Sequence, residues 1–259
     1  MSAPRAVRAR SPARSPAPIR PDAEADAGQS LRVQAYERFR REILDGRLRA
    51  GQFVSQRQLT ELLEMPLGAV REMIPRLEAV QLIHTVPKRG LQVTPVDLRL
   101  IRNAFQVRTL IEREAVVHFA RSVGDAELEA LEAQHRAILA RAESAQPDAT
   151  LDHDAEAVDW GLHDRMVDAM DNGILSEIYR VNSLHVRLIR IDSRLVRPQR
   201  VIPAMVEHLR FIQALRAHDV PQAVDMLLAH IDASRQRILQ RAGAALSAPD
   251  ARAPGARAR

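Results

Sequence analysis

The chain has 259 residues and a formal net charge of +5, and 46% of its residues are hydrophobic. It has no cysteine, which excludes disulfides, thiolate metal sites and a cysteine nucleophile. No apolar run approaches the roughly 18 residues that a membrane span needs. Glycine-rich phosphate-binding motifs are also absent, so we expect a mainly α-helical, cytoplasmic protein with no membrane segment.

Basic residues are concentrated toward the N-terminal part of the chain. Residues 31–98 carry eleven basic and eight acidic side chains, whereas residues 99–240 carry 18 and 21. Residues 1–30 and 243–259 are rich in Ala, Pro and Arg and have almost no large apolar side chains, so we expect both to be disordered basic tails. This distribution indicates that residues 31–98 bind a polyanion and that the longer segment after them has a different function.

The spacing of apolar residues and the signals for helix ends predict three helices after the N-terminal tail. Apolar side chains at helical spacing begin at Leu31 and end before Gly46, a typical helix terminator. Ser55 and Gln58 have the spacing of a capping box, which marks the start of a second helix. Pro66 suits the first turn of a third helix, because its missing N–H would be unpaired there in any case.

A basic hairpin follows the third helix. Residues 82–86 and 91–94 alternate like two short strands around a tight tip. Two short helices and such a hairpin form a winged helix-turn-helix, whose second short helix lies in the major groove of DNA. We therefore expect 31–96 to bind DNA; the alternative is a helical domain for protein contacts. The cations and helix-terminal amides available for DNA belong to Arg57, Gly68, Ala69, Arg71, Arg76, Lys88 and Arg89.

Five short motifs in this segment resemble the DNA-binding domain of GntR-type bacterial transcription regulators. They are I-L-x-G-x-L-x-x-G at 43–51, S-x-R-x-L in the second helix, V-R-E in the third, R-L-E-x-x-x-L-I at 76–83, and R-G in the hairpin. Carried over by position, the residues that touch DNA in that family are Arg57, Arg71, Arg89 and Gly90.

The third helix departs from the family pattern at two places. Residues 66–69 read P-L-G-A where family members usually read S-R-T-P or T-R-T. Leu67 therefore stands where an arginine often pairs with a guanine, and it can make only apolar contact. Pro75 lies in the helix interior, where proline costs roughly 3 kcal/mol and can kink the axis. We expect an altered operator sequence or helix pose, with DNA binding retained.

Residues 97–242 are predicted to be helical throughout. Helices of this length pack as an antiparallel bundle, whose interior is a usual place for metal and ligand sites. The predicted helices run from Asp97 to Gly124, from Asp125 to about 143, and near 151–171, 173–192, 201–218 and 220–241.

Four residues of this bundle have side chains suited to a metal ion. Asp159 and His163 lie at i, i+4 on one helix, while His208 and His230 lie on the last two. Three imidazoles and a carboxylate suit Zn²⁺, Ni²⁺, Mn²⁺ or Fe²⁺ without choosing among them. The spacing alone leaves open that these histidines are merely buried with partners or exposed. The other histidines, His135 and His185 among them, have no evident partner in the sequence.

The segment V-D-W-G-L-H-D-R-M-V-D-A-M-D-N resembles the D-x-x-F-H…N signature of the FCD effector domain, the C-terminal domain of FadR-type GntR regulators. E-H-L-R-F-I-Q-A-L-R-A-H-D and M-L-L-A-H resemble the segments with its two later histidines. The resemblance implies that Asp159, His163, His208 and His230 bind a divalent metal. It further implies that Arg108, in the V-R-x-x-L-E segment, and Asn172 bind an effector.

The two resemblances together imply a homodimeric, ligand-responsive transcription regulator rather than an enzyme. Its partners would be a palindromic operator in double-stranded DNA and a small organic or sugar acid. Binding of the acid would alter the affinity for the operator, and we expect the regulator to be a repressor. Two alternatives stay open on the residues alone. One is a metal-dependent, hydrolase-like enzyme with a DNA-binding appendage. The other is a regulator whose metal is purely structural.

Overall fold

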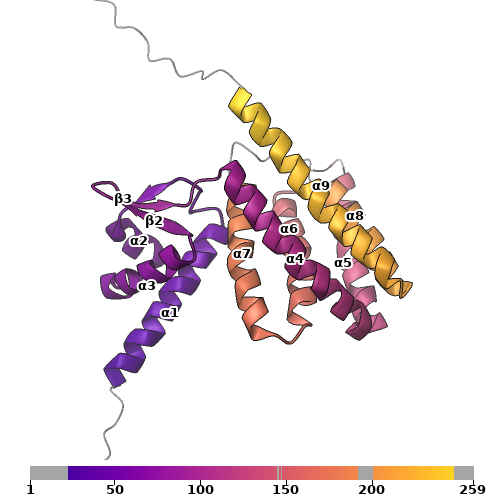
Figure 1. Cartoon of the computed structure of the whole chain (residues 1–259), viewed down its shortest axis with the longest axis horizontal. Coiled ribbons are helices and arrows are strands. Elements are labelled where there is room, and N and C mark those ends of the chain that lie inside the picture. The colour runs from indigo at the N-terminus through magenta and orange to yellow at the C-terminus, as the bar shows by residue number, and fades with distance from the viewer. Residues whose placement is uncertain (1–22, 145, 147, 192–200, 248–259) are drawn as a thin grey trace, which may run out of the picture.

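The computed structural model describes residues 23–144, 146, 148–191 and 201–247 of the chain (Figure 1). Helix α1 begins at Ala23, eight residues before the predicted start, and α9 extends to Ser247. Residues 23–30 and 243–247, which we expected to be disordered, are therefore helical. Each extends a helix that is already nucleated, so every added residue needs only propagation. The rest of the expected tails lies outside the described residues.

The first half of the fold, here called the winged region, is a three-helix unit with a small sheet. The sheet has the strand order β1-β3-β2, and both pairings are antiparallel. The β2–β3 hairpin was predicted, whereas the two-residue strand β1 was not. The elements are α1 (Ala23–Leu44), β1 (Phe53–Val54), α2 (Gln56–Leu63), α3 (Leu67–Ala79), β2 (Ile83–Val86) and β3 (Gly90–Val93).

Local signals in the sequence set the helix ends of this region. The predicted capping box is confirmed: Ser55 Oγ accepts from the Gln58 backbone N–H at 3.1 Å, and the Gln58 side chain accepts from the Ser55 N–H at 2.8 Å. Pro66 is the N-cap residue of α3 rather than its first helical residue. The helix continues through Pro75, which lies on its exposed side.

The second half, here called the bundle, consists of six helices in the described residues. All six were predicted, and Asp97 caps the first of them by accepting from the Leu100 N–H at 2.6 Å. None of the helices in the described parts of the chain is long and apolar enough to cross a membrane. The helices are α4 (Leu98–Ser122), α5 (Asp125–Glu143), α6 (Leu151–Asp168), α7 (Gly173–Ile191), α8 (Val201–Arg216) and α9 (Val220–Ser247).

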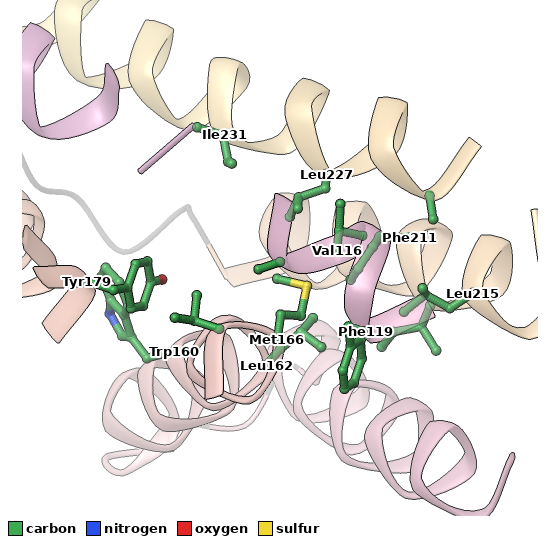
Figure 2. Close-up of a cluster of buried hydrophobic side chains, with 14 of the residues drawn as sticks. Val116, Phe119, Trp160, Leu162, Met166, Tyr179, Phe211, Leu215, Leu227 and Ile231 are labelled. Atoms are coloured by element: carbon green, nitrogen blue, oxygen red, sulfur yellow. The ribbon is translucent and has the colours of Figure 1, made fainter. Parts of the chain in front are cut away.

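The bundle core is built from apolar side chains that every one of these helices contributes. Figure 2 shows them converging from several helices, with Met166 near the middle of the view. The large side chains buried there include Phe105, Phe119, Trp160, Tyr179 and Phe211. Burying each removes about 150–250 Å² of an aromatic side chain from water, which holds the helices in fixed relative positions.

Helix α7 belongs to the cores of both halves. Leu184 and Leu188 are buried in the apolar cluster of the winged region, whereas Tyr179 is buried in the bundle. Figure 1 shows α7 at the side of the bundle that adjoins α1. The His185 imidazole bonds through Nε2, at 3.0 Å, to the carbonyl of Val80 at the end of α3. One helix therefore joins α3 to the interior of the bundle.

Candidate metal centre

Four potential metal ligands converge in the interior of the bundle. Asp159 and His163 lie one turn apart on α6, His208 lies on α8 and His230 on α9. One ligand atom from each lies within 4.8 Å of the others, and all four residues are at most 4% exposed. The structure therefore brings together the four residues whose spacing suggested a metal site.

Two of the imidazoles are oriented by hydrogen bonds at Nδ1. His208 Nδ1 lies 3.1 Å from Nε2 of His135, whose own Nδ1 lies 2.7 Å from the carbonyl of Leu131. A carbonyl can only accept, so His135 carries its proton on Nδ1 and its Nε2 accepts from His208. His230 donates from Nδ1 to Oε2 of Glu207 at 2.8 Å. Both ligand histidines therefore keep a lone pair on Nε2.

The two residues on α6 are held by charged neighbours. His163 Nδ1 lies 2.8 Å from Oε2 of Glu112, although the pair is too poorly aligned for a hydrogen bond. Its Nε2 accepts from Arg108 Nη2 at 2.7 Å, so this nitrogen also has a lone pair, and a metal bound to it would replace that hydrogen bond. Asp159 uses Oδ2 to pair with Arg190 at 2.5 Å, while its Oδ1 lies 3.5 Å from His208 Nε2. Every candidate ligand thus has an outer partner, as metal-binding side chains usually do.

Burial and charge keep these groups in the protonation states that a cation needs. Burial lowers the pKa of His208 well below its usual range and that of His230 to about 4. Burial alone would raise the pKa of Asp159, but Arg190 and the nearby histidines hold it well below the ordinary value. At neutral pH two imidazoles are therefore neutral and the carboxylate is ionised.

The contact between His208 and His230 is the one that a cation between the four residues would best explain. Nε2 of His208 and Nε2 of His230 lie only 3.2 Å apart, and the partners of their Nδ1 atoms leave a lone pair on each. Two facing lone pairs repel one another unless a positive charge lies between them. The donor set of three nitrogens and one carboxylate oxygen therefore fits a divalent ion of the Zn²⁺, Ni²⁺, Mn²⁺ or Fe²⁺ type.

The sequence did not reveal the outer partners of this cluster. His135 was set aside as a histidine without a partner, yet it is fully buried against His208. Glu207 adjoins His208 in sequence, but its carboxylate accepts a hydrogen bond from His230 on the next helix. Only Glu112 had a signal in the sequence, its i, i+4 spacing from Arg108; the two side chains form a buried ion pair with an Nε–Oε1 distance of 2.7 Å.

The two expected effector residues lie in different surroundings. Arg108 is 1% exposed and donates to both Glu112 and His163, which places it inside the cluster. Asn172 is exposed, and its Oδ1 accepts from the backbone N–H groups of Ile174 and Leu175 at the start of α7. In the described residues no contact links Asn172 to the cluster, so its visible role is to cap α7.

The expected DNA-binding residues lie on α2, α3 and the wing. Arg71 Nε donates to the Gln56 side chain at 3.0 Å, and the Arg89 guanidinium stacks over Phe53 at 3.8 Å from the ring centroid. Gly90 has φ +92°, and a Cβ there would approach the Val54 carbonyl oxygen to 3.2 Å, so the turn requires glycine. The other exposed members of the set are Arg57, Gly68 and Lys88.

Two members of that set face other parts of the protein. The Arg76 guanidinium lies 3.9 Å from the ring centroid of Tyr36 and pairs with Glu177 on α7 at 3.1 Å. Its guanidinium therefore takes part in the contact between the winged region and the bundle. Ala69 is 6% exposed and turns its methyl group into the core, which leaves only its backbone for DNA.

Comparison with known proteins matches both halves of this architecture. Residues 31–93 match the family of bacterial regulatory proteins named gntR, and residues 103–233 match the FCD domain, which alone is half of the chain. The chain belongs to the FCD-domain regulators of the GntR family. This membership confirms the two resemblances and their order along the sequence, and it makes the protein a DNA-binding transcription regulator.

Several relatives support the same assignment. The HTH-type transcriptional regulator BphR of Paraburkholderia xenovorans (strain LB400) is 29% identical over 212 residues, covering 80% of this chain and 84% of its own. The structures of McbR/YncC from E. coli and of a GntR protein from Rhodococcus sp. RHA1 have TM-scores of 0.65 and 0.66. Each is 19% identical and covers 82% of this chain and 98% of its own, so these two similarities establish the fold.

Proposed function

We propose that this GntR-family regulator is a homodimeric repressor whose bundle binds a divalent metal and a small carboxylate effector. In this proposal residues 31–96 bind a palindromic operator and residues 97–242 bind the metal and effector. The observation that carries it is the inward set of Asp159, His163, His208 and His230, in which the lone pairs of His208 and His230 face each other at 3.2 Å.

Four protein ligands suit a cation that keeps room for a further ligand. Bound there, such an ion supplies a positive charge that attracts a carboxylate. Arg108 is the matching second anchor, because its guanidinium lies within the cluster and can donate to a carboxylate through more than one N–H. Trp160 is surrounded by further cations: its ring lies 4.3 Å from Arg187 and 5.4 Å from Arg190. A small anionic ligand therefore matches the charge of this interior.

Helix α7 offers the route from the effector to DNA. Its Tyr179 hydroxyl donates to Glu112 at 2.7 Å, and its Arg190 holds the Asp159 carboxylate. Its other contacts, His185 to Val80 and Glu177 to Arg76, fix the C-terminal end of α3 to the same helix. A ligand that favours one position of α7 shifts the spacing of the two recognition helices in a dimer, and so the operator affinity.

The test is a DNA-binding isotherm against the region upstream of the protein's own gene, with and without a panel of small carboxylic acids. The native protein is compared with the double variant His208→Ala/His230→Ala, and with His118→Ala, which removes an exposed histidine of α4. We expect one acid to weaken specific binding by the native protein and by His118→Ala but not by the double variant. If all three proteins respond alike, or none responds to any acid, the proposal is refuted.

A further inference from the structure

The exposed side of recognition helix α3 begins with an apolar residue. Leu67 is the first residue of this helix and its side chain is 40% exposed, whereas Val70 and Ile74 on the opposite side are buried. In helix-turn-helix proteins the N-terminal residues of this helix reach the edges of bases in the major groove. A large apolar side chain therefore stands where base reading takes place.

The neighbouring residues at the start of α3 neither cover the Leu67 side chain nor place a polar side chain beside it. Pro66, the N-cap residue, makes no side-chain hydrogen bond to the helix and has no polar side-chain atom. Gly68 has no side chain, and a Cβ built there would meet nothing within 4 Å. Ala69 is buried. The first turn of α3 therefore offers the bases one exposed isobutyl group and no side-chain hydrogen bond.

The first side chain on this face of α3 that can donate a hydrogen bond to a base is Arg71, one helical turn after Leu67. Its Nε is bound to Gln56 on α2, which fixes the direction of the guanidinium. Residues four apart on a helix lie about 5–6 Å from one another, and stacked bases are about 3.4 Å apart. Leu67 and Arg71 therefore reach base pairs that are one or two steps apart.

We propose that Leu67 reads the 5-methyl group of a thymine in each operator half-site, one or two base pairs from the pair that Arg71 contacts. Each base pair presents hydrogen-bonding groups in the major groove, and the thymine methyl is the apolar group among them. An apolar side chain gains nothing from a guanine or adenine edge, whose acceptors would lose water without a new partner. Leu67 thus selects a base by its methyl group rather than by a hydrogen bond.

Deoxyuridine tests the proposal without altering the protein, because it lacks only the methyl group of thymine. Operator duplexes are selected from a random library by the full-length protein, and each thymine of the selected half-site is then replaced in turn by deoxyuridine. We expect one position to lose about fourfold in affinity per half-site, the equivalent of one buried methyl-sized group, while the other positions change little.

The variant Leu67→Ala assigns that loss to the side chain. It is expected to bind the thymine and deoxyuridine duplexes equally and to accept any base at this one position in a new selection. Leu98→Ala is the matched control, because Leu98 is also the first residue of a helix and is 45% exposed. The proposal is overturned if the half-site has no preferred thymine, or if deoxyuridine weakens binding by Leu67→Ala as much as by the native protein.

Discussion

Removing the Glu207 carboxylate is expected to weaken metal binding although Glu207 is not a ligand. It holds the Nδ1–H of His230 at 2.8 Å and accepts from Arg237 at 2.7 and 3.1 Å. Loss of such an outer carboxylate typically costs about 10- to 100-fold in metal affinity. The Glu207 side chain is 22% exposed, so water can replace part of its role, and we expect Glu207→Ala to lose about tenfold, or about 1.4 kcal/mol.

The assay is an equilibrium competition for Zn²⁺ between the full-length protein and a chromophoric chelator. Glu132→Ala is the control, because Glu132 is also a partly buried carboxylate that pairs with two arginines, Arg136 and Arg216. Thermal unfolding in the presence of EDTA checks that both variants fold to the same extent. A Kd for Glu207→Ala within twofold of the values for native protein and Glu132→Ala would refute the role of the outer carboxylate.

Three further predictions concern stability. Leu188→Ala, at a fully buried position where α7 enters the winged core, should lower the free energy of unfolding by about 2–5 kcal/mol in denaturant titrations, and a loss below about 1 kcal/mol would contradict this role. Burial lowers the pKa of His185, so the unfolded chain takes up a proton at this residue first as the pH falls below about 6.5. The free energy of unfolding of native protein should then fall by up to about 1.4 kcal/mol per pH unit more than that of His185→Gln. Parallel pH profiles of the two proteins would contradict this. Ser55→Ala removes the capping box and should cost about 1 kcal/mol; an unchanged midpoint would show that the cap contributes nothing.

Local and periodic signals in the sequence predicted most of the fold. The capping box at Ser55, the cap at Asp97 and the hairpin turn that leads into Gly90 each depend on a few neighbouring residues, and all three are present in the structure. Strand β1 was missed because two residues carry no periodicity and pair only through the distant β3. The helical start at Ala23 was missed because composition cannot show that an adjoining helix will propagate.

The candidate metal centre was only partly visible in the sequence. Its four inward residues follow from i, i+4 spacing and from the family motifs, but the partners that orient them come from other helices. His135 meets His208 across 73 positions, and Arg190 meets Asp159 across 31. Arg76 shows the same limit, since its pairing with Glu177 depends on how α3 meets α7. Contacts of this kind follow from tertiary packing, which a single sequence does not display.

The contribution of α7 to the winged core bears on how such regulators can be recombined. Leu184 and Leu188 come from the second half of the chain, yet they complete the apolar cluster around α1 and α3. A chimera that joins this winged region to the FCD domain of a relative will lack that apolar surface unless the same two positions are also transferred. Exchange of FCD domains between these proteins is therefore limited by one face of a helix as well as by the point at which the chain is joined.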